Sequence, residues 1–247
     1  MENTKLDYLE DTYLFDTDAK LLSVENYEGE KLSLILDHTI MYPQAGGQPY
    51  DTGEISQQDL IFIVTEVRFK DSKVYHIGHF EKENFITGEV HVHINEERRK
   101  LHARIHTAGH LVDDALYFFG YNKDLTPLKG YHYPDGPYIE YVGELAGDLQ
   151  SIAKELENKV NEIIATDYQT HAEIVSSLDD LKQCLYVPSH IPEGKPIRIV
   201  YASAPDKGQP CGGTHVKHLL QVGKVIIPKI KVKQGNTRIS YQLADGS

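Results

Sequence analysis

Residues 1–93 consist of short apolar or alternating runs separated by turn residues. The clearest runs lie at 32–36, 60–64 and 89–94, where aliphatic, β-branched and aromatic residues predominate. Short strands punctuated in this way are typical of a small β-barrel. We therefore predict an N-terminal β-barrel domain over residues 1–93, which also carries a glycine-rich segment at 43–53.

The pattern changes to a helical period after residue 94. Apolar residues recur at helical spacing along the stretch from Asn95 to Phe119, with Asn95 as a candidate N-cap and Gly120 just past the end. A second amphipathic helix is predicted over 148–167, with Asp148 as its cap. Strands are predicted at 138–142, at 196–202 and from 223 to the end.

These elements predict an α+β fold with two domains. The barrel of residues 1–93 precedes an α/β two-layer sandwich formed by residues 94–247, in which helices pack on one sheet. A chain of 247 residues is long enough to bury a core in each part. No internal repeat or low-complexity segment interrupts this plan.

Composition indicates a reducing compartment. The chain has two cysteines, Cys184 and Cys211, and its start, Met1 to Lys5, is polar. No apolar run approaches the length that spans a membrane, so we expect no membrane association and a cytoplasmic location. The sequence leaves the oligomeric state open.

The net charge of −12 is unevenly distributed along the chain. Residues 1–94 carry −11, residues 95–205 carry −6 and residues 206–247 carry +5. In the basic segment, lysines alternate with aliphatic residues, which would place them on one face of a strand. Such a face is either solvated or in contact with phosphate, since RNA binding requires lysine and arginine. The candidate RNA-binding residues are Arg98, Arg99, Lys229, Lys231, Lys233 and Arg238.

Two pairs of metal-capable side chains stand out, His106 with His110 and Cys211 with His215. On a helix, residues four apart lie one turn above the other, about 6 Å along the axis, so the two histidines point the same way. A histidine pair alone could equally be a polar patch on a helix. Together, the two pairs make a complete ligand set for one zinc ion per chain. Three protein ligands would indicate a catalytic zinc and four a structural one, and both alternatives remain open.

Three ordered motifs resemble the alanyl-tRNA editing family, which comprises the editing domain of alanyl-tRNA synthetase and its free-standing AlaX-type relatives. The motifs are Pro43-Gln-Ala-Gly-Gly-Gln-Pro-Tyr-Asp-Thr-Gly53, His106-Thr-Ala-Gly-His-Leu111 and Cys211-Gly-Gly-Thr-His-Val216. The resemblance extends over roughly residues 39–240. Gly109 departs from it, because the family more often carries a larger residue there. Residues 130–135 match only loosely.

The resemblance implies a free-standing trans-editing enzyme. Its reaction would be zinc-dependent hydrolysis of the ester in mischarged tRNA-Ala, chiefly the seryl form, with the glycyl form as a second candidate. The tRNA acceptor end would be the partner. It is single-stranded and could stack on Tyr131, Tyr133 or Tyr138. A metalloprotease is excluded, because no glutamate follows His106 as a His-Glu-x-x-His motif requires.

Three residues are candidates for the reaction itself. Gln48 and Thr107 are polar side chains within the motifs that could recognise the serine hydroxyl, as could Thr214. Asp114, like Asp113, follows His110 on the same side of the helix and could orient a ligand or act as a base. Each also has an ordinary alternative role. Gln48 could lie in a turn, Thr107 could bond to the helix backbone and Thr214 could cap a helix. The two aspartates could be solvated acids.

Two rival functions remain. A non-catalytic protein that binds the tRNA end would hold the same four residues around a structural zinc. A zinc hydrolase of small esters or amides would suit the acidic composition.

Overall fold

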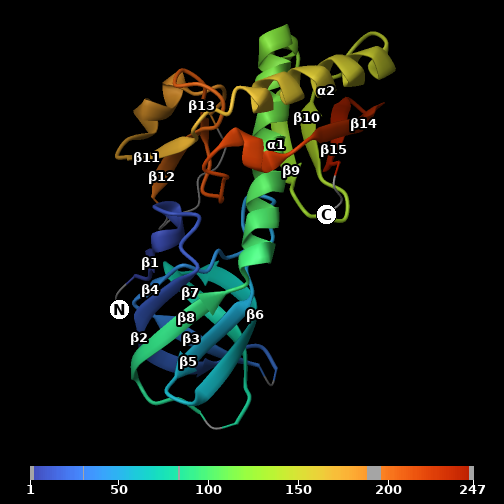
Figure 1. Cartoon of the computed structure of the whole chain (residues 1–247). Helices are drawn as coiled ribbons and strands as arrows, with labels where there is room; N and C mark the ends of the chain where they lie inside the picture. The colour runs from blue at the N-terminus through green and yellow to red at the C-terminus, as the bar shows by residue number, and fades with distance from the viewer. Residues whose placement is uncertain (1–2, 30, 83, 188–195, 245–247) are drawn as a thin grey trace. The chain divides into compact units, whose positions relative to one another are not determined.

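The structure, a computed structural model, describes residues 3–29, 31–82, 84–187 and 196–244 (Figure 1). Within these residues the chain forms two compact units. One contains residues 3–45 and 49–100, and the other contains 46–48, 101–187 and 196–244. The division falls inside α1 (Glu96–Phe119). Gly46–Gln48, at the centre of the glycine-rich motif, groups with the second unit.

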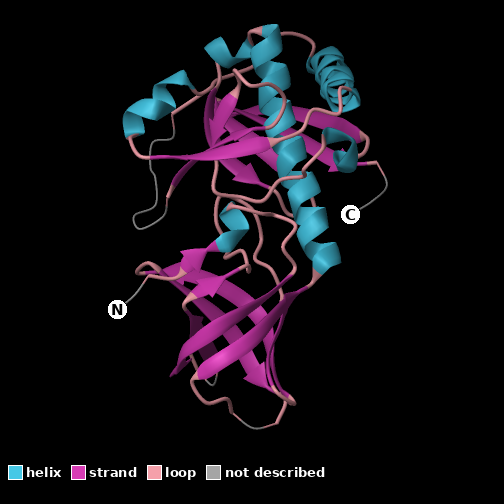
Figure 2. Ribbon diagram, turned by 60° about the vertical axis from the view of Figure 1, so that its left-hand side comes forward, coloured by secondary structure: helices cyan, strands magenta, loops and turns pink. Residues whose placement is uncertain are grey.

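The first unit is a closed antiparallel barrel, as the strand pattern predicted (Figures 1 and 2). Its core is formed by alternate strand residues such as Leu34, Phe62 and Val92, all fully buried. A short parallel pair and a 3-10 helix accompany the barrel: β1 (Lys5–Leu6), β4 (His38–Thr39) and η1 (Asp7–Leu9). The barrel strands, in spatial order, are β2 (Asp16–Asn26), β3 (Leu32–Leu36), β7 (Lys73–Phe80), β6 (Leu60–Lys70), β5 (Gly53–Gln57) and β8 (Gly88–Ile94).

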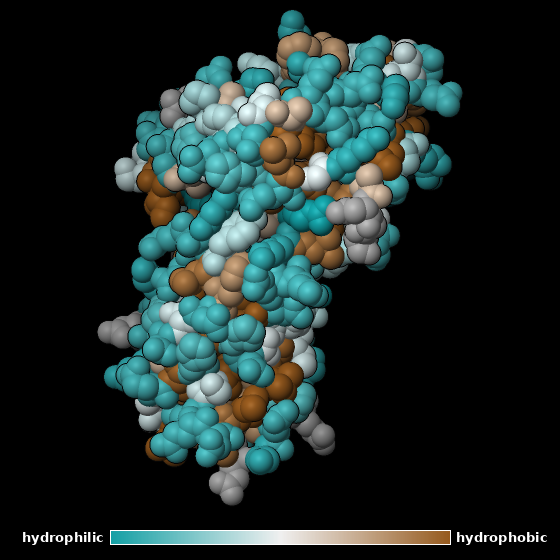
Figure 3. All heavy atoms as spheres, viewed as in Figure 1, coloured by the Kyte–Doolittle hydropathy of each residue, from teal (hydrophilic) through white to brown (hydrophobic). Residues whose placement is uncertain are grey.

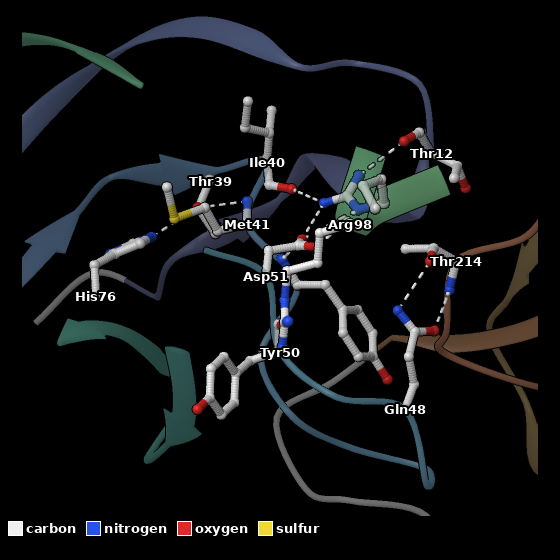
Figure 4. A network of polar contacts seen from close by, with 12 residues as sticks. Thr12, Thr39, Ile40, Met41, Gln48, Tyr50, Asp51, His76, Arg98 and Thr214 are labelled. Atoms are coloured by element: carbon white, nitrogen blue, oxygen red, sulfur yellow. Dashed lines mark hydrogen bonds and ion pairs between the residues drawn. The ribbon is translucent and has the colours of Figure 1, made fainter. Parts of the chain in front are cut away.

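Arg99 belongs to the interior of this unit, which corrects its prediction as an RNA contact. Its side chain is fully buried and forms an ion pair with Asp51. The same guanidinium donates hydrogen bonds to the carbonyl of Thr12 at 2.8 Å and to that of Ile40 at 2.5 Å. Figure 4 labels the three partners of this guanidinium, Thr12, Ile40 and Asp51, which lie close together. A guanidinium enclosed in this way cannot reach a phosphate. Arg98 stays partly exposed, with its Nε 3.0 Å from the carbonyl of Tyr50.

The second unit is built on two helices and a four-stranded antiparallel sheet. α1 and α2 (Leu149–Ala165) share their core with one face of this sheet, where Leu116, Leu156, Ile139 and Ile239 meet. Both helices begin where the sequence predicted, since the side chains of Asn95 and Asp148 accept hydrogen bonds from backbone N–H groups of the first turn. The sheet order is β14 (Val225–Lys233), β15 (Asn236–Leu243), β10 (Tyr138–Val142) and β9 (Thr126–Tyr131).

A separate three-stranded sheet completes this unit. The predicted two-layer sandwich did not include this second sheet. It has its own small core of Leu181, Ile199 and Tyr201. Thr214, considered as a helix cap, lies in an irregular segment where no helix begins. The sheet consists of β11 (His171–Val175), β12 (Ile197–Tyr201) and β13 (Gly208–Pro210), and the remaining 3-10 helices are η2 (Tyr121–Lys123), η3 (Leu178–Gln183) and η4 (Leu219–Val222).

Hydrophilic residues cover much of the face seen in Figure 3, with hydrophobic patches between them. Within the described ranges, neither helix is both long enough and apolar enough to span a membrane.

Candidate metal centre

Two pairs of side chains, about a hundred residues apart in sequence, lie together in the second unit. His106 and His110 come from consecutive turns of α1, and Cys211 and His215 come from the loop that follows β13. Their ligand atoms all lie within 4.8 Å of one another. Each pair therefore converges on one point, as its four-residue spacing predicted.

Two separations within the cluster fit a tetrahedral metal. Cys211 Sγ lies 3.5 Å from His106 Nε2 and 3.4 Å from His215 Nε2. Zinc–sulfur bonds of about 2.3 Å and zinc–nitrogen bonds of about 2.0–2.1 Å at a tetrahedral angle place the two ligand atoms about 3.5 Å apart. His110 Nδ1 is buried without a hydrogen-bond partner among the described residues. The donor set, two to three imidazoles and a thiol, is the one that zinc prefers.

Gln48 fixes the orientation of His106. Its Oε1 lies 2.7 Å from His106 Nδ1 and accepts a backbone N–H from Thr214 at 3.0 Å, while its Nε2 donates to Thr214 Oγ1 at 2.9 Å. Figure 4 shows the two bonds between Gln48 and Thr214. With Nδ1–H donated to the amide oxygen, the lone pair of His106 is on Nε2, the atom that faces Cys211. Gln48 thus joins all three motifs.

Thr107 fixes His215 in the same manner. Its hydroxyl donates to the carbonyl of Ala103 at 2.8 Å and accepts the backbone N–H of Val216 at 3.2 Å, and it lies 3.1 Å from His215 Nδ1. Because the hydroxyl proton is already donated, His215 Nδ1 acts as the donor and Nε2 carries the lone pair toward Cys211. Thr107 and Gln48 are fully buried. Both are therefore positioned to orient the cluster, and neither can reach a substrate hydroxyl.

The Cys211 loop is held by Arg198 on β12. Its guanidinium donates to the carbonyl of Gly213 at 2.9 Å and to that of Cys211 at 3.2 Å. Gly213 N–H in turn lies 3.3 Å from Cys211 Sγ. A Cβ on Gly213 would stand 2.1 Å from His106 Cε1, so only glycine allows this approach, whereas one on Gly212 would meet nothing within 4 Å.

A fourth histidine, His132, stacks on the cluster. Its ring lies 4.4 Å from that of His106 at an interplanar angle of 24°, and its Nδ1 is hydrogen-bonded to the Tyr241 hydroxyl. Its backbone N–H donates to the carbonyl of Gly47 at 2.8 Å. Gly109 provides the space for this ring, since a Cβ there would come within 2.6 Å of it. The departure of Gly109 from the family pattern thus coincides with the position of His132.

Burial keeps the three imidazoles of the cluster in the neutral state that a metal requires. It lowers the pKa of His110 to about 3 and those of His106 and His215 well below their ordinary range, so the imidazoles are neutral at neutral pH. Burial also raises the pKa of the Cys211 thiol, opposed by the Gly213 N–H and the Arg198 charge. A bound zinc ion would deprotonate this thiol.

The two aspartates after His110 differ in their surroundings. Asp114 is buried, and its Oδ1 accepts a hydrogen bond at 3.0 Å from Gln209 Nε2, which also lies 3.1 Å from the carbonyl of His110. This hydrogen bond joins Asp114 on α1 to Gln209 on β13. Burial raises the pKa of Asp114 to about 6. Asp113 accepts a 2.5 Å hydrogen bond from the Tyr141 hydroxyl, and burial raises its pKa to about 7.

Asp113 keeps some exposure because it lines a cavity of about 250 Å³. Tyr186 also lines this cavity. Burial raises the pKa of Tyr186 well above its ordinary range, and the nearby charges of Asp113 and Cys211 add to the effect. Other lining residues are Leu116, Tyr117, Asn122, Leu125, Thr126, Pro127, Tyr141, Leu185 and Val187.

The remaining candidates lie on the sheet surface. Lys229, Lys231 and Lys233 are exposed on β14, and Arg238 lies on β15 directly opposite Lys231. Arg238 also pairs with Glu140 at 3.1 Å. Because the three lysines alternate with aliphatic residues along β14, they lie on one face of the strand, as predicted.

Four residues of the site were not identified from the sequence: Arg198, His132, Gln209 and Tyr241. Each acts through a contact between elements far apart in the chain, with no local spacing to reveal it. His132 had the only signal, a buried histidine between two tyrosines in the loosely matching segment 130–135.

Comparison with known proteins points to aminoacyl-tRNA enzymes. Residues 7–98 match the family described as tRNA synthetases class II (A). The alanyl-tRNA editing protein AlaX-L of Pyrococcus horikoshii is 32% identical over 93% of this chain and 55% of its own length. Alanine–tRNA ligases of Halobacterium salinarum and Methanococcoides burtonii are 30% and 29% identical over 98% and 100% of this chain.

The chain spans about half the length of AlaX-L and about a quarter of each of these ligases. The three motifs and the similarity over nearly all of the chain agree, which confirms its resemblance to the alanyl-tRNA editing family.

Proposed function

We propose that this chain is a zinc-dependent hydrolase that deacylates mischarged tRNA-Ala, chiefly Ser-tRNA-Ala, with Gly-tRNA-Ala as a second substrate. The observation that carries the proposal is the convergence of His106, His110, Cys211 and His215 on one point. The naming of related proteins as alanyl-tRNA editing proteins supports the substrate class.

In the hydrolase, three of the four side chains of the cluster would hold one zinc ion and leave its fourth position to a water molecule, whose pKa the ion would lower. Gln48 and Thr107 keep Nε2 of His106 and His215 turned toward Cys211, so the ligand geometry exists before the metal binds. Cys211 is partly exposed, which leaves a side of the cluster open to substrate.

The cavity that Asp113 lines, three residues beyond His110 on α1, is the proposed aminoacyl pocket. Asp113 supplies its acid, and the Tyr141 hydroxyl holds that carboxyl in place. A pKa of about 7 allows Asp113 to be ionised near neutral pH, where it would pair with the α-ammonium group of the aminoacyl ester. This role replaces recognition of the serine hydroxyl by Thr107 and Thr214, because both hydroxyls are buried and already hydrogen-bonded.

The test is hydrolysis of Ser-tRNA-Ala beside Ala-tRNA-Ala, before and after removal of metal. We expect Ser-tRNA-Ala to be deacylated, Ala-tRNA-Ala to be spared, and zinc alone to restore activity to the metal-free protein. Equal hydrolysis of both would contradict an editing function and favour a general esterase.

A second function rests on the tight set of four ligands. If all four side chains bind the metal at once, the zinc would be structural and the chain would bind the tRNA end without hydrolysing it. X-ray absorption at the zinc edge separates the two proposals. One sulfur with two nitrogens and a light oxygen ligand supports the hydrolase, and one sulfur with three nitrogens supports the binding protein.

A further inference from the structure

Three glycines from different parts of the second unit enclose the ring of His132. A Cβ on Gly130 would lie 2.4 Å from its Nε2, one on Gly109 would lie 2.6 Å from its Cε1, and one on Gly47 would lie 3.2 Å from its Cδ2. The first two distances are far below the separation of about 3.5–4.0 Å at which non-bonded carbon atoms attract each other. A side chain at Gly109 or Gly130 would therefore displace the imidazole.

Gly109 needs a particular explanation, because it lies inside α1. After proline, glycine is the residue least suited to a helix interior, so a glycine here lowers the stability of the helix. Gly109 follows His106 by three residues, which makes the two neighbours on the helix surface. The side chain that Gly109 lacks would fill the space beside His106 in which the ring of His132 lies. The position of His132 thus accounts for a glycine that the helix itself does not favour.

Two hydrogen bonds hold His132 in this space. Its Nδ1 is hydrogen-bonded to the hydroxyl of Tyr241, which itself donates to the carbonyl of Ile105 at 3.2 Å. Because the hydroxyl proton is donated there, Nδ1 of His132 is the donor. The backbone N–H of His132 donates to the carbonyl of Gly47 at 2.8 Å. Both the ring and the main chain of His132 are therefore fixed.

The stacked ring restricts a movement of His106 that its hydrogen bond leaves free. Gln48 accepts from Nδ1 of His106 along the ring plane and thereby selects Nε2 as the nitrogen that faces Cys211. The ring of His132, 4.4 Å away at 24°, covers one face of His106 and opposes a tilt of that ring. A metal requires both restraints, since Nε2 must carry the lone pair and must also point at the ion.

We propose that His132 is a positioning residue of the metal centre, which holds the ring plane of His106 and thereby supports the affinity and geometry of a bound zinc ion. This role rests on the zinc site proposed above and does not depend on hydrolysis of an ester. The four candidate ligands have their ligand atoms within 4.8 Å of one another, and His132 is not among them. His132 would therefore act through His106 and not on the metal directly.

The test combines zinc affinity, measured by competition with a coloured chelator, with the visible absorption of the cobalt-loaded chain. His132→Ala should weaken zinc binding about 10-fold, at the lower end of the loss that follows removal of a group supporting a metal ligand. It should also weaken and shift the cobalt d–d bands, because these bands depend on the angles between the ligands. Neither measurement requires turnover.

His171→Ala is the matched control. His171 also stacks on an aromatic ring, with its centroid 4.6 Å from that of Tyr201 at 7°, but it lies on the three-stranded sheet. Its loss removes one stacked imidazole without touching the cluster. We expect the zinc affinity and the cobalt bands of this variant to match those of the unaltered chain.

Gly130 offers a way to move His132 without removing it. The three atoms nearest to a Cβ at Gly130 all belong to the ring of His132. Gly130→Ala should therefore weaken zinc binding as His132→Ala does. In a chain that already carries His132→Ala, Gly130→Ala should cause no further loss, because the clash no longer exists. Such non-additivity identifies the contact between the two residues as the cause.

Unchanged zinc affinity and cobalt bands in folded His132→Ala would overturn the proposal, as would losses that simply add in the double variant. The melting temperature of each variant shows whether it is folded, and Gly130→Ala decides the matter if His132→Ala is not. Failure of the deacylase proposal is a separate outcome. A chain that binds zinc but leaves Ser-tRNA-Ala intact would contradict the enzyme function, and its zinc affinities would still decide the role of His132.

Discussion

The side-chain oxygen of Gln48 lies 2.7 Å from Nδ1 of His106 and connects the glycine-rich motif to the metal centre. Hydrogen bonds of this kind set the tautomer of a metal-binding histidine and contribute to metal affinity. Gln48 would thus support a bound metal although it is not itself a candidate ligand.

We predict that Gln48→Ala weakens zinc binding by about 10- to 100-fold, because His106 loses the partner that orients its ring. Competition with a coloured chelator measures the affinity. Gln44→Ala, at an exposed position of the same motif, is the control and should leave zinc binding unchanged. Equal affinities for the two variants would show that Gln48 does not support the ligand.

The neighbouring residues Gly213 and Gly212 provide a second matched pair of variants. Gly213→Ala places a methyl group 2.1 Å from His106 Cε1, so the loop or the histidine must move. We expect lost zinc affinity and a destabilisation of about 1–3 kcal/mol in urea unfolding, as for other overpacked sites. Gly212→Ala meets no atom within 4 Å and should behave as the unaltered chain. A Gly213 variant that keeps its zinc and its stability would refute the packing argument.

The sequence predicted the elements well wherever a local signal existed. Asn95 and Asp148 marked the two helix starts by their capping side chains, and the strand runs of the barrel carried their own alternation. The spacing of the motifs also predicted the cluster. Arg198 and His132 could not be found in this way, because their roles arise only when β12 and β9 meet the metal loop and α1.

Arg99 shows why a charged residue can be misassigned from sequence. Its neighbour Arg98 is partly exposed, so two consecutive residues of one helix are a partly exposed arginine and a fully buried one. The partner that enforces burial, Asp51, is 48 positions away. Nothing in the Arg98-Arg99-Lys100 run distinguishes the two.

We predict that Arg99→Leu destabilises the protein by about 3–5 kcal/mol, because Asp51 would be left as a buried, unpaired charge. Arg98→Leu should cost less than about 1 kcal/mol, as expected for a partly exposed arginine. Chemical unfolding at neutral pH compares them. Similar losses for both variants would contradict the burial of Arg99.

Asp113 predicts a specific pH dependence. Its pKa is raised from 3.8 to about 7 by burial, so the folded state binds a proton that the unfolded state has released. The stability that this group contributes is complete below pH 4 and is lost as the pH rises to about 7 and above. Replacing the group should remove this loss.

We therefore expect Asp113→Asn to raise the melting temperature relative to the unaltered chain at pH 8 and to change it little near pH 4. Melting curves between pH 4 and 8, recorded for both proteins in the same buffers, measure the difference. A constant offset across this range would show that Asp113 does not titrate with a raised pKa.

We propose that the four-residue cluster forms a zinc site that hydrolyses the seryl ester. The most direct test is the rate of Ser-tRNA-Ala deacylation by Cys211→Ala, with Cys184→Ala as the control for loss of a thiol and zinc content measured for each. We predict that Cys211→Ala loses both zinc and activity while Cys184→Ala keeps both near normal. A folded Cys211→Ala variant that retains its zinc and its rate of deacylation would contradict the account.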